Sequence, residues 1–201
     1  QGGRADRGAG VFCYQSSPTI QNCIINNNQA TDDGGGIMIL HANPVIDDCE
    51  IENNLAGWDG GGVACIGGTP SILNSSIHGN IASDDGGGVY CFNSASPQIE
   101  SCLIYENIAA QDGGGIFGGY LSQPTLSFYQ LCSNDGGNIA GSWIDAQFNL
   151  FFEVCDDCDS NGIADSVDLK AGTLSDVDSD GVPDQCESDC DGDGTPDPIE
   201  I

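Results

Sequence analysis

Short apolar segments separated by polar turns recur at a nearly constant interval over the first two thirds of the chain. Within one unit, a strand such as residues 89–91 follows a run of glycines, and a proline-containing turn follows the strand. Two more short strands and an asparagine-rich turn complete the unit. No window carries ten residues with the 3.6-residue period of a helix, so the pattern predicts three strands and three turns per unit. The repeated positions are Pro18, Pro44, Pro70, Pro97 and Pro124; Ile20, Ile46, Ile72, Ile99 and Leu126; and Ile25, Ile51, Ile77, Ile104 and Leu131.

A fixed period of 26 or 27 residues predicts a repeat architecture in which each unit forms one coil of a parallel β-helix. Coils of this kind stack about 4.8 Å apart, so the isoleucine and leucine columns should lie above one another and fill the interior. A column of asparagines should form a ladder of hydrogen bonds from coil to coil. Glycine triplets mark one corner, where a positive φ or a close backbone approach is needed. The asparagines are Asn28, Asn54, Asn80 and Asn107, and the triplets are residues 34–36, 60–62, 86–88 and 113–115.

With these glycines and isoleucine columns, residues 8–131 resemble the right-handed parallel β-helix repeat proteins of bacterial cell surfaces, including those with GGGI-type repeats. The resemblance specifies the fold well and the function poorly. The expected fold class is all-β: a parallel β-helix of about five coils, followed by a C-terminal cap and a calcium-loop tail.

The composition divides the chain into three segments. Residues 1–131 hold the β-helix repeats. Residues 132–155 break the period with an apolar cluster that should cap the last coil. Residues 156–201 form an acidic tail, and about half of the 31 acidic residues lie beyond residue 152. The cluster of the capping segment is Trp143, Ile144, Phe148, Leu150, Phe151 and Phe152.

The net charge restricts the partners of the chain. Three Lys and Arg residues stand against 31 Asp and Glu residues, which gives a formal charge of −28. Three basic side chains are too few to neutralise the phosphates of a nucleic acid or an anionic lipid surface. We therefore expect neither as a partner. No apolar run approaches the roughly 18 residues of a membrane span.

Eleven cysteines are typical of an oxidising compartment, so we expect an extracellular or cell-surface protein. Zinc is a weaker interpretation, because neither histidine lies near paired cysteines. A redox role for the C-x-x-C of Cys155 and Cys158 is also weaker, because the surrounding carboxylates disfavour a thiolate. A disulfide between Cys132 and Cys155 is favoured. The chain starts at Gln1 without a visible signal peptide, which fits a processed or excerpted mature protein.

Three segments of the acidic tail share the spacing of calcium-binding loops. Oxygen ligands stand at positions 1, 3, 5, 9 and 12, glycine stands at position 6, and position 7 offers its backbone carbonyl. We therefore expect calcium as the bound ion. The ligands are Asp157, Asp159, Asn161, Ile163, Asp165 and Asp168 in the first loop; Asp176, Asp178, Asp180, Val182, Asp184 and Glu187 in the second; and Asp189, Asp191, Asp193, Thr195, Asp197 and Glu200 in the third.

The loops are too close together for the flanking helices of an EF-hand. Only Ser188 separates the second from the third. The tail therefore resembles thrombospondin type 3 repeats, which implies that calcium ions act as the core of a segment with little apolar interior. The cysteines depart from that family, because only Cys158, Cys186 and Cys190 lie in or beside the loops.

Two further columns leave alternatives open. Asp33, Asp59, Asp85, Asp112 and Asp135 precede the glycine corner, where we expect each carboxylate to cap backbone N–H groups of its own turn. The alternative is cation binding along this edge.

The cysteine columns, which should point inward, are expected to be buried thiols. The alternative is disulfides between adjacent coils, Cys23 with Cys49 and Cys65 with Cys91. The two columns are Cys13, Cys65 and Cys91, and Cys23, Cys49 and Cys102.

An enzyme is not expected. Lyases of this shape need a cationic base on the coils, but Arg4, Arg7 and Lys170 stand outside the repeats. Hydrolases need convergent carboxylates, and no pair stands out from the solvated surface. His41 and His78 occupy different columns, so they do not form a site together. The outward acidic residues are Asp47, Asp48, Glu50, Glu52, Glu100 and Glu106.

These observations predict a secreted, non-catalytic structural protein that calcium stabilises and that assembles head-to-tail into an extracellular filament or surface layer. The first coil, near residues 8–23, has no visible cap, so its strand edges invite the tail of another copy. Arg4 and Arg7 would then meet that acidic tail. The alternative is a module that binds glycans or a cell surface, and a polysaccharide-degrading β-helix enzyme ranks third. Few aromatics mark a glycan platform on the coils: Trp58, Tyr90, Tyr105 and Tyr120.

Overall fold

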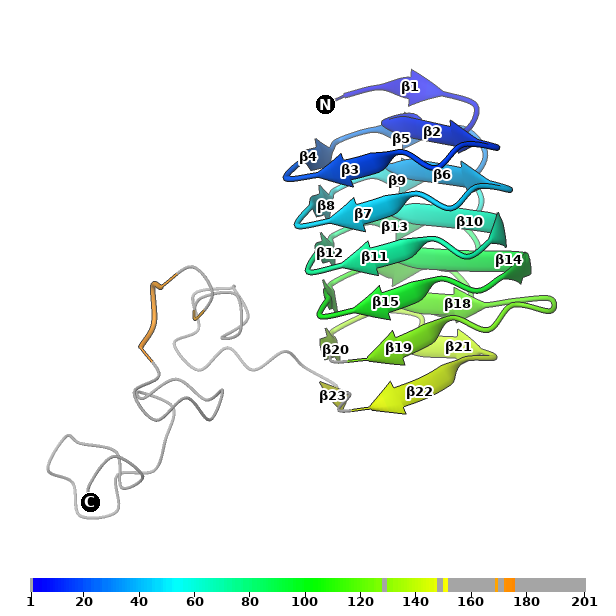
Figure 1. Ribbon diagram of the computed structural model, residues 1–201. Coiled ribbons are helices and arrows are strands. Elements are labelled where there is room, and N and C mark those ends of the chain that lie inside the picture. Colours follow the sequence, from blue (N-terminus) through cyan, green and yellow to red (C-terminus); the bar gives the residue numbers. More distant parts are fainter. Residues whose placement is uncertain (1, 128–129, 148–149, 152–168, 170–171, 176–201) are drawn as a thin grey trace, which may run out of the picture. The chain divides into compact units, whose positions relative to one another are not determined.

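The structure is a computed structural model, and it describes residues 2–127, 130–147, 150–151, 169 and 172–175. The chain forms two compact units, Gln1–Glu153 and Val154–Ile201. All the named strands belong to the first unit, which is a parallel β-helix as predicted (Figure 1). The domain limits predicted at residues 131 and 155 stay predictions.

Successive coils stack their strands into four parallel sheets, where the sequence predicted three strands per coil. The additional strand has two residues, and from β5 onward it follows the ladder asparagine of its coil. In these strands the second residue is a buried alanine, such as Ala56 or Ala82, whereas Ala5 of the first strand is exposed. Two residues are too short to show an alternating pattern, so sequence analysis missed this sheet. Its strands are β1 Arg4–Ala5, β5 Gln29–Ala30, β9 Leu55–Ala56, β13 Ile81–Ala82 and β17 Ile108–Ala109.

The other three sheets have six strands each. One contains β2 Val11–Tyr14, β6 Ile37–Leu40, β10 Val63–Gly68, β14 Val89–Ala95, β18 Ile116–Gly118 and β21 Ile139–Gly141. Another contains β3 Thr19–Gln21, β7 Val45–Asp47, β11 Ser71–Leu73, β15 Gln98–Glu100, β19 Thr125–Ser127 and β22 Ile144–Gln147. The last contains β4 Ile24–Asn26, β8 Glu50–Glu52, β12 Ser76–His78, β16 Leu103–Tyr105, β20 Gln130–Cys132 and β23 Leu150–Phe151.

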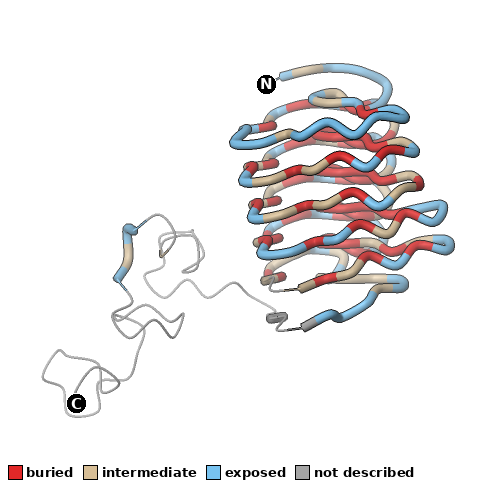
Figure 2. Tube along the Cα trace, viewed as in Figure 1, coloured by how far each residue is buried: buried red, intermediate tan, exposed pale blue. Residues whose placement is uncertain are grey.

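The apolar columns lie in register, as predicted. Ile72 pairs with Ile46 on one side and Ile99 on the other, and all three are fully buried. Figure 2 shows buried residues recurring at corresponding places in successive coils. Burying an isoleucine side chain contributes about 1.5–3 kcal/mol relative to leaving it exposed, so these columns are a main source of stability.

The predicted asparagine ladder is present inside one corner of the coils. The backbone N–H and Nδ2 of Asn54 both donate to Oδ1 of Asn80, each at 3.0 Å. Asn80 makes the same two bonds to Asn107. Asn134 extends the ladder by one coil, since its Oδ1 accepts from Asn107. The ladder therefore supplies hydrogen-bond partners to buried backbone groups at this turn. An isoleucine side chain could not supply them.

The glycine corner has the close approach that the triplets suggested. A Cβ atom on Gly62 would lie 2.6 Å from the carbonyl oxygen of Gly88 in the next coil. At Gly60 the backbone also has a φ of +66°, which side-chain-bearing residues rarely adopt. Glycine is thus required by the spacing of neighbouring coils as well as by the local turn.

Part of the segment predicted as a cap continues the coil. β21, β22 and β23 each add a strand to a sheet, and the partly buried Trp143 packs against the core. The turn before β21 is shorter than in earlier coils, because Ile139 pairs with Ile116. Asp135 therefore bridges to Ile108 and does not join the aspartate column, which corrects the alignment made from sequence.

Candidate functional site

Five aromatic side chains lie on the outer face of the sheet that contains β2 and β14, and Tyr120 lies beside them in the turn after β18. We call this surface the aromatic face. Successive side chains along each strand point to opposite sides of the sheet. In β14, Val89 and Cys91 therefore point inward, while Tyr90 and Phe92 point outward. The side chain of Phe92 is 38% exposed and that of Tyr120 is 63% exposed. The residues of the face are Phe12, Tyr14, Tyr90, Phe92, Phe117 and Tyr120.

Four of these rings form one cluster. Tyr90 stacks on Phe117 with ring centroids 5.6 Å apart and on Phe92 at 6.0 Å. Phe92 in turn contacts Tyr120 at 6.1 Å. Offset stacks of this spacing hold rings in place and add to the area that they bury. The cluster therefore presents a preformed apolar surface to solvent.

Aliphatic side chains connect this cluster to the other two rings. Met38 and Ala64 are fully buried under the outer face, and Leu40 and Ile66 pack partly buried beside them. The outer side of this sheet is thus apolar across five successive coils. Exposed apolar residues gathered on one face can mark a binding site, and the exposed residues here are Phe12, Tyr14, Phe92 and Tyr120.

A ladder of aspartates runs along the glycine corner next to the aromatic face. Oδ1 of Asp59 accepts the backbone N–H of Asp85 at 3.0 Å, and Asp85 accepts that of Asp112 at 3.2 Å. Asp33 accepts the N–H of Asp59. The sequence analysis expected each carboxylate to cap its own turn. In the structure, each carboxylate caps a backbone N–H of the next coil instead. Because coils stack in register, the N–H of the corresponding aspartate in the next coil lies within hydrogen-bond distance of the carboxylate.

Burial changes the acidity of these groups. It raises the pKa of Asp59 to about 6, although hydrogen bonds from Asp85 and from the Tyr90 hydroxyl oppose the shift. Burial also raises the pKa of Tyr90, and the Asp59 charge adds to this. At the end of the ladder, Arg7 forms an ion pair with Asp32 at 2.6 Å and lies 3.6 Å from Asp33. Arg4 lies in β1, which pairs with β5, and Arg7 forms these ion pairs with the next coil, so the placement of both arginines outside the repeats was wrong.

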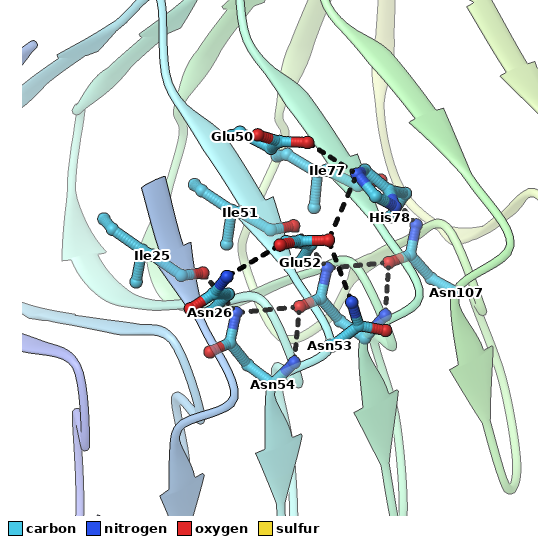
Figure 3. Close-up of polar contacts among 11 residues, drawn as sticks. Ile25, Asn26, Glu50, Ile51, Glu52, Asn53, Asn54, Ile77, His78 and Asn107 are labelled. Atoms are coloured by element: carbon cyan, nitrogen blue, oxygen red, sulfur yellow. Dashed lines mark hydrogen bonds and ion pairs between the residues drawn. The ribbon is translucent and has the colours of Figure 1, made fainter. Parts of the chain in front are cut away.

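A second cluster lies on the outer face of another sheet. Glu50 and Glu52 alternate along β8, and His78 pairs with Glu52 in the register of β8 and β12. Nε2 of His78 lies 3.5 Å from Oε1 of Glu50 and 4.0 Å from Oε2 of Glu52. Figure 3 shows the three side chains pointing toward one another. We call them the Glu–Glu–His cluster.

Neighbouring side chains hold this cluster in place. Nδ2 of Asn26 donates to Oε1 of Glu52 at 2.7 Å, and Nδ2 of Asn53 donates to its Oε2 at 2.9 Å. The His78 ring stacks on Tyr105 with centroids 4.6 Å apart. Burial is the main cause that raises the pKa of Tyr105 to about 12, so the hydroxyl stays neutral.

The sequence analysis missed this cluster. It compared His78 only with His41 and treated Glu50 and Glu52 as solvated surface. The signal that could have found it is the repeat itself: one period before His78 stands Glu52, and two residues before that stands Glu50. Sequence columns reveal such neighbours only when unlike residue types are compared across coils.

The family comparison matches the architecture. The family model described as "Right handed beta helix region" matches residues 4–163. The chain belongs to this family. The comparison with curated proteins and the comparison with solved structures each found no match. The β-helix resemblance seen in the repeats is confirmed, while the GGGI subtype and the thrombospondin-like tail stay predictions.

The predicted calcium ligands of this right-handed β-helix lie outside the described residues. None of the positions from Asp157 to Glu200 that were assigned to the three loops can be placed in the structure. Among the described residues, no helix is long and apolar enough to cross a membrane.

The cysteine columns are buried as expected, except at Cys23. Cys13, Cys65 and Cys91 are core residues in one column, and their thiols are not joined by disulfides. A hydrogen bond with Cys65, together with burial, raises the pKa of the Cys91 thiol well above its ordinary value. Cys49 is also a buried thiol, whereas Cys23 is exposed and departs from the predicted inward orientation. The pairing of Cys132 stays a prediction, because Cys155 lies outside the described residues.

Proposed function

We propose that this right-handed β-helix is a secreted, non-catalytic structural protein of the cell exterior that adheres to uncharged glycans through its aromatic face. The observation that carries the proposal is the preformed cluster of Tyr90, Phe92, Phe117 and Tyr120. The β-helix family is compatible with both the structural and the adhesive part of this role.

Ring chemistry favours a sugar as the ligand. Sugar rings carry C–H groups that pack on aromatic faces, while a tyrosine also offers a hydroxyl for hydrogen bonding at its wet end. Phe92 and Tyr120 are exposed enough to make such contacts. The sequence analysis found few aromatics for a platform because Phe117 and Tyr120 become neighbours of Tyr90 and Phe92 only when the coils stack.

Charge favours an uncharged glycan. Asp33, Asp59 and Asp85 run along the corner beside the face, and the whole chain has a formal charge of −28. An acidic polysaccharide would be repelled at low ionic strength. A neutral polymer meets no such barrier.

The structural part of the proposal includes calcium at the three acidic loops. The spacing of carboxylates and glycine in the tail supports calcium as the ion, and millimolar calcium outside cells suits weak loops of this kind. Self-association through the first coil and the tail belongs to the same proposal. Since Arg7 is already paired with Asp32, Arg4 is the arginine left to meet the tail of a neighbour.

The non-catalytic part is supported by the use of the carboxylates. Asp33, Asp59 and Asp85 each accept a backbone N–H of the next coil, which assigns them to the scaffold. A turnover assay on the bound polysaccharide tests this part, and released oligosaccharides would contradict it.

Binding to an array of neutral and acidic polysaccharides tests the adhesive part. We expect binding to a neutral polymer, and Phe92→Ala or Tyr120→Ala should weaken it by about tenfold or more, as the loss of an aromatic stacking contact does elsewhere. Ile108→Ala, at a 40% exposed apolar residue of another sheet, is the matched control and should bind as the wild type. Equal binding by all variants, or binding to acidic polymers alone, would contradict the proposal.

Light scattering in millimolar calcium tests the assembly part. Filaments or large oligomers are expected, and chelation should reduce them. A strict monomer at high concentration with calcium present would refute self-association while leaving glycan binding intact.

A further inference from the structure

We propose that the Glu–Glu–His cluster, Glu50, Glu52 and His78, binds a divalent transition-metal ion such as Zn²⁺ on the outer face of the β-helix. This site is separate from the calcium loops expected in the tail and from the aromatic face. It does not depend on the proposed glycan binding.

The positions of the donor atoms come from the strand register. Alternate residues of β8 point to the same side, so both glutamates project outward, and the parallel register sets His78 beside Glu52. One donor atom from each residue lies within 4.8 Å of the others. Within the described part of the chain, this is the one group of three such ligands that meets that distance.

These distances are close to those of a bound ion. Zn²⁺ binds imidazole nitrogen and carboxylate oxygen at about 2.0–2.2 Å, so two ligands of a tetrahedral ion lie roughly 3.4 Å apart. The separation of 3.5 Å between His78 and Glu50 already fits. The 4.0 Å between His78 and Glu52 requires a movement of about half an ångström, which a glutamate side chain makes by a small rotation.

The donor set selects the class of metal. Calcium and magnesium take oxygen ligands, whereas imidazole suits zinc, copper, nickel and iron. One nitrogen and two carboxylate oxygens therefore favour a transition metal. Three protein ligands leave at least one position for water, and the 45% exposed side chain of Glu50 leaves the site open to solvent.

The surroundings reduce the cost of ordering the ligands. Asn26 and Asn53 hold the two oxygens of Glu52, and each oxygen keeps a second lone pair for the ion. Stacking on Tyr105 fixes the plane of the His78 ring. Neighbours that orient ligands in this way typically change metal affinity 10- to 100-fold. Hydrogen bonds to Glu52 and ring stacking on His78 therefore orient these ligands in addition to the strand register.

Imidazole NMR of the full-length protein tests the site directly. The chain has two histidines, so each ring gives its own set of signals. Zn²⁺ is titrated in excess calcium, which occupies the acidic loops. We expect Zn²⁺ to shift the His78 signals at one equivalent and to leave those of His41 unchanged. Zinc captured by cysteines elsewhere in the chain would not move the His78 signals.

Variants separate ligands from bystanders. Glu50→Gln and Glu52→Gln should each raise the apparent Kd for Zn²⁺ at His78 by about tenfold or more, because each removes a charged ligand. Glu100→Gln, at an exposed residue of β15, is the matched control and should titrate as the wild type. Circular dichroism confirms that each variant keeps its β-helix. Unshifted His78 signals, equal shifts of both histidines, or unchanged affinity in both glutamate variants would overturn the proposal.

Discussion

Oδ1 of Asn80 accepts two hydrogen bonds from Asn54, one from the backbone N–H and one from Nδ2, each at 3.0 Å. Nδ2 of Asn80 donates in turn to the Ile51 carbonyl at 2.8 Å and to Asn107 at 2.9 Å. The side chain is fully buried. One amide thus connects three coils, and it needs both its donor and its acceptor atoms.

Replacing Asn80 by aspartate should therefore disrupt the β-helix. Asn80→Asp keeps the shape but removes the donor and buries a charge, so we expect the free energy of unfolding to fall by about 3 kcal/mol or more. Chemical denaturation measures this loss. Gln98→Glu makes the same amide-to-acid change at an exposed residue of β15 and should stay within about 0.5 kcal/mol of the wild type. Equal losses in the two variants would show that the ladder is not required.

Asp59 predicts how stability varies with pH. Its pKa is raised to about 6 in the folded protein, mainly by burial, from an ordinary value of 3.8. The folded state therefore holds this proton more tightly than the unfolded state. The resulting stabilisation is fully present below pH 4 and is lost as the pH rises through 6. Burial raises the pKa of Asp33 and Asp85 as well, so they act in the same direction.

Asp59→Asn removes this pH dependence while it keeps the Oδ1 acceptor for Asp85. Its advantage over the wild type should be small at pH 4 and reach the order of 1 kcal/mol at pH 7, after allowance for solvent screening. Denaturation at several pH values measures the difference, with Glu100→Gln as an exposed control. A constant difference between pH 4 and pH 7 would contradict the assignment.

Cysteine accessibility gives an independent check of the coil packing. Cys23 is exposed, whereas Cys65 and Cys91 are fully buried. Iodoacetamide should modify Cys23 in the native protein more than about tenfold faster than the two buried thiols. Peptide mapping by mass spectrometry assigns the sites, and Cys23→Ser identifies the fast phase. Rapid native labelling of Cys65, or its recovery in a disulfide with Cys91, would contradict the structure.

Calcium removal should affect the tail and the coils differently. The three loops concentrate carboxylates in a segment with few apolar residues, so we expect the tail to fold only with its ions. Calorimetry with a chelator should therefore lose or shift a transition of the tail while the β-helix transition persists. If no transition moves when calcium is removed, the tail does not bind the ion as proposed.

Single substitutions assign the transitions to the two parts of the chain. Asp178→Ala and Gly181→Val should raise the calcium requirement of the tail, one by losing a ligand and the other by blocking the turn. Ile72→Asp should open the coils, because it puts a charge among fully buried side chains. Limited proteolysis reports which part opens, and equal effects on both parts would refute the division.

The sequence by itself determined the coil, because its main features repeat with one period. Columns such as Ile46, Ile72 and Ile99, and the ladder of Asn54 and Asn80, follow directly from stacking equal residues at equal intervals. Only the tertiary structure decided what unlike residues do together. The two-residue strands, the capping of one coil by an aspartate of another, and the place of Asp135 after a shortened turn depend on register and loop length. The aromatic face and the Glu–Glu–His cluster arise in the same way, because side chains 26 or 27 residues apart become neighbours only when adjacent coils lie side by side.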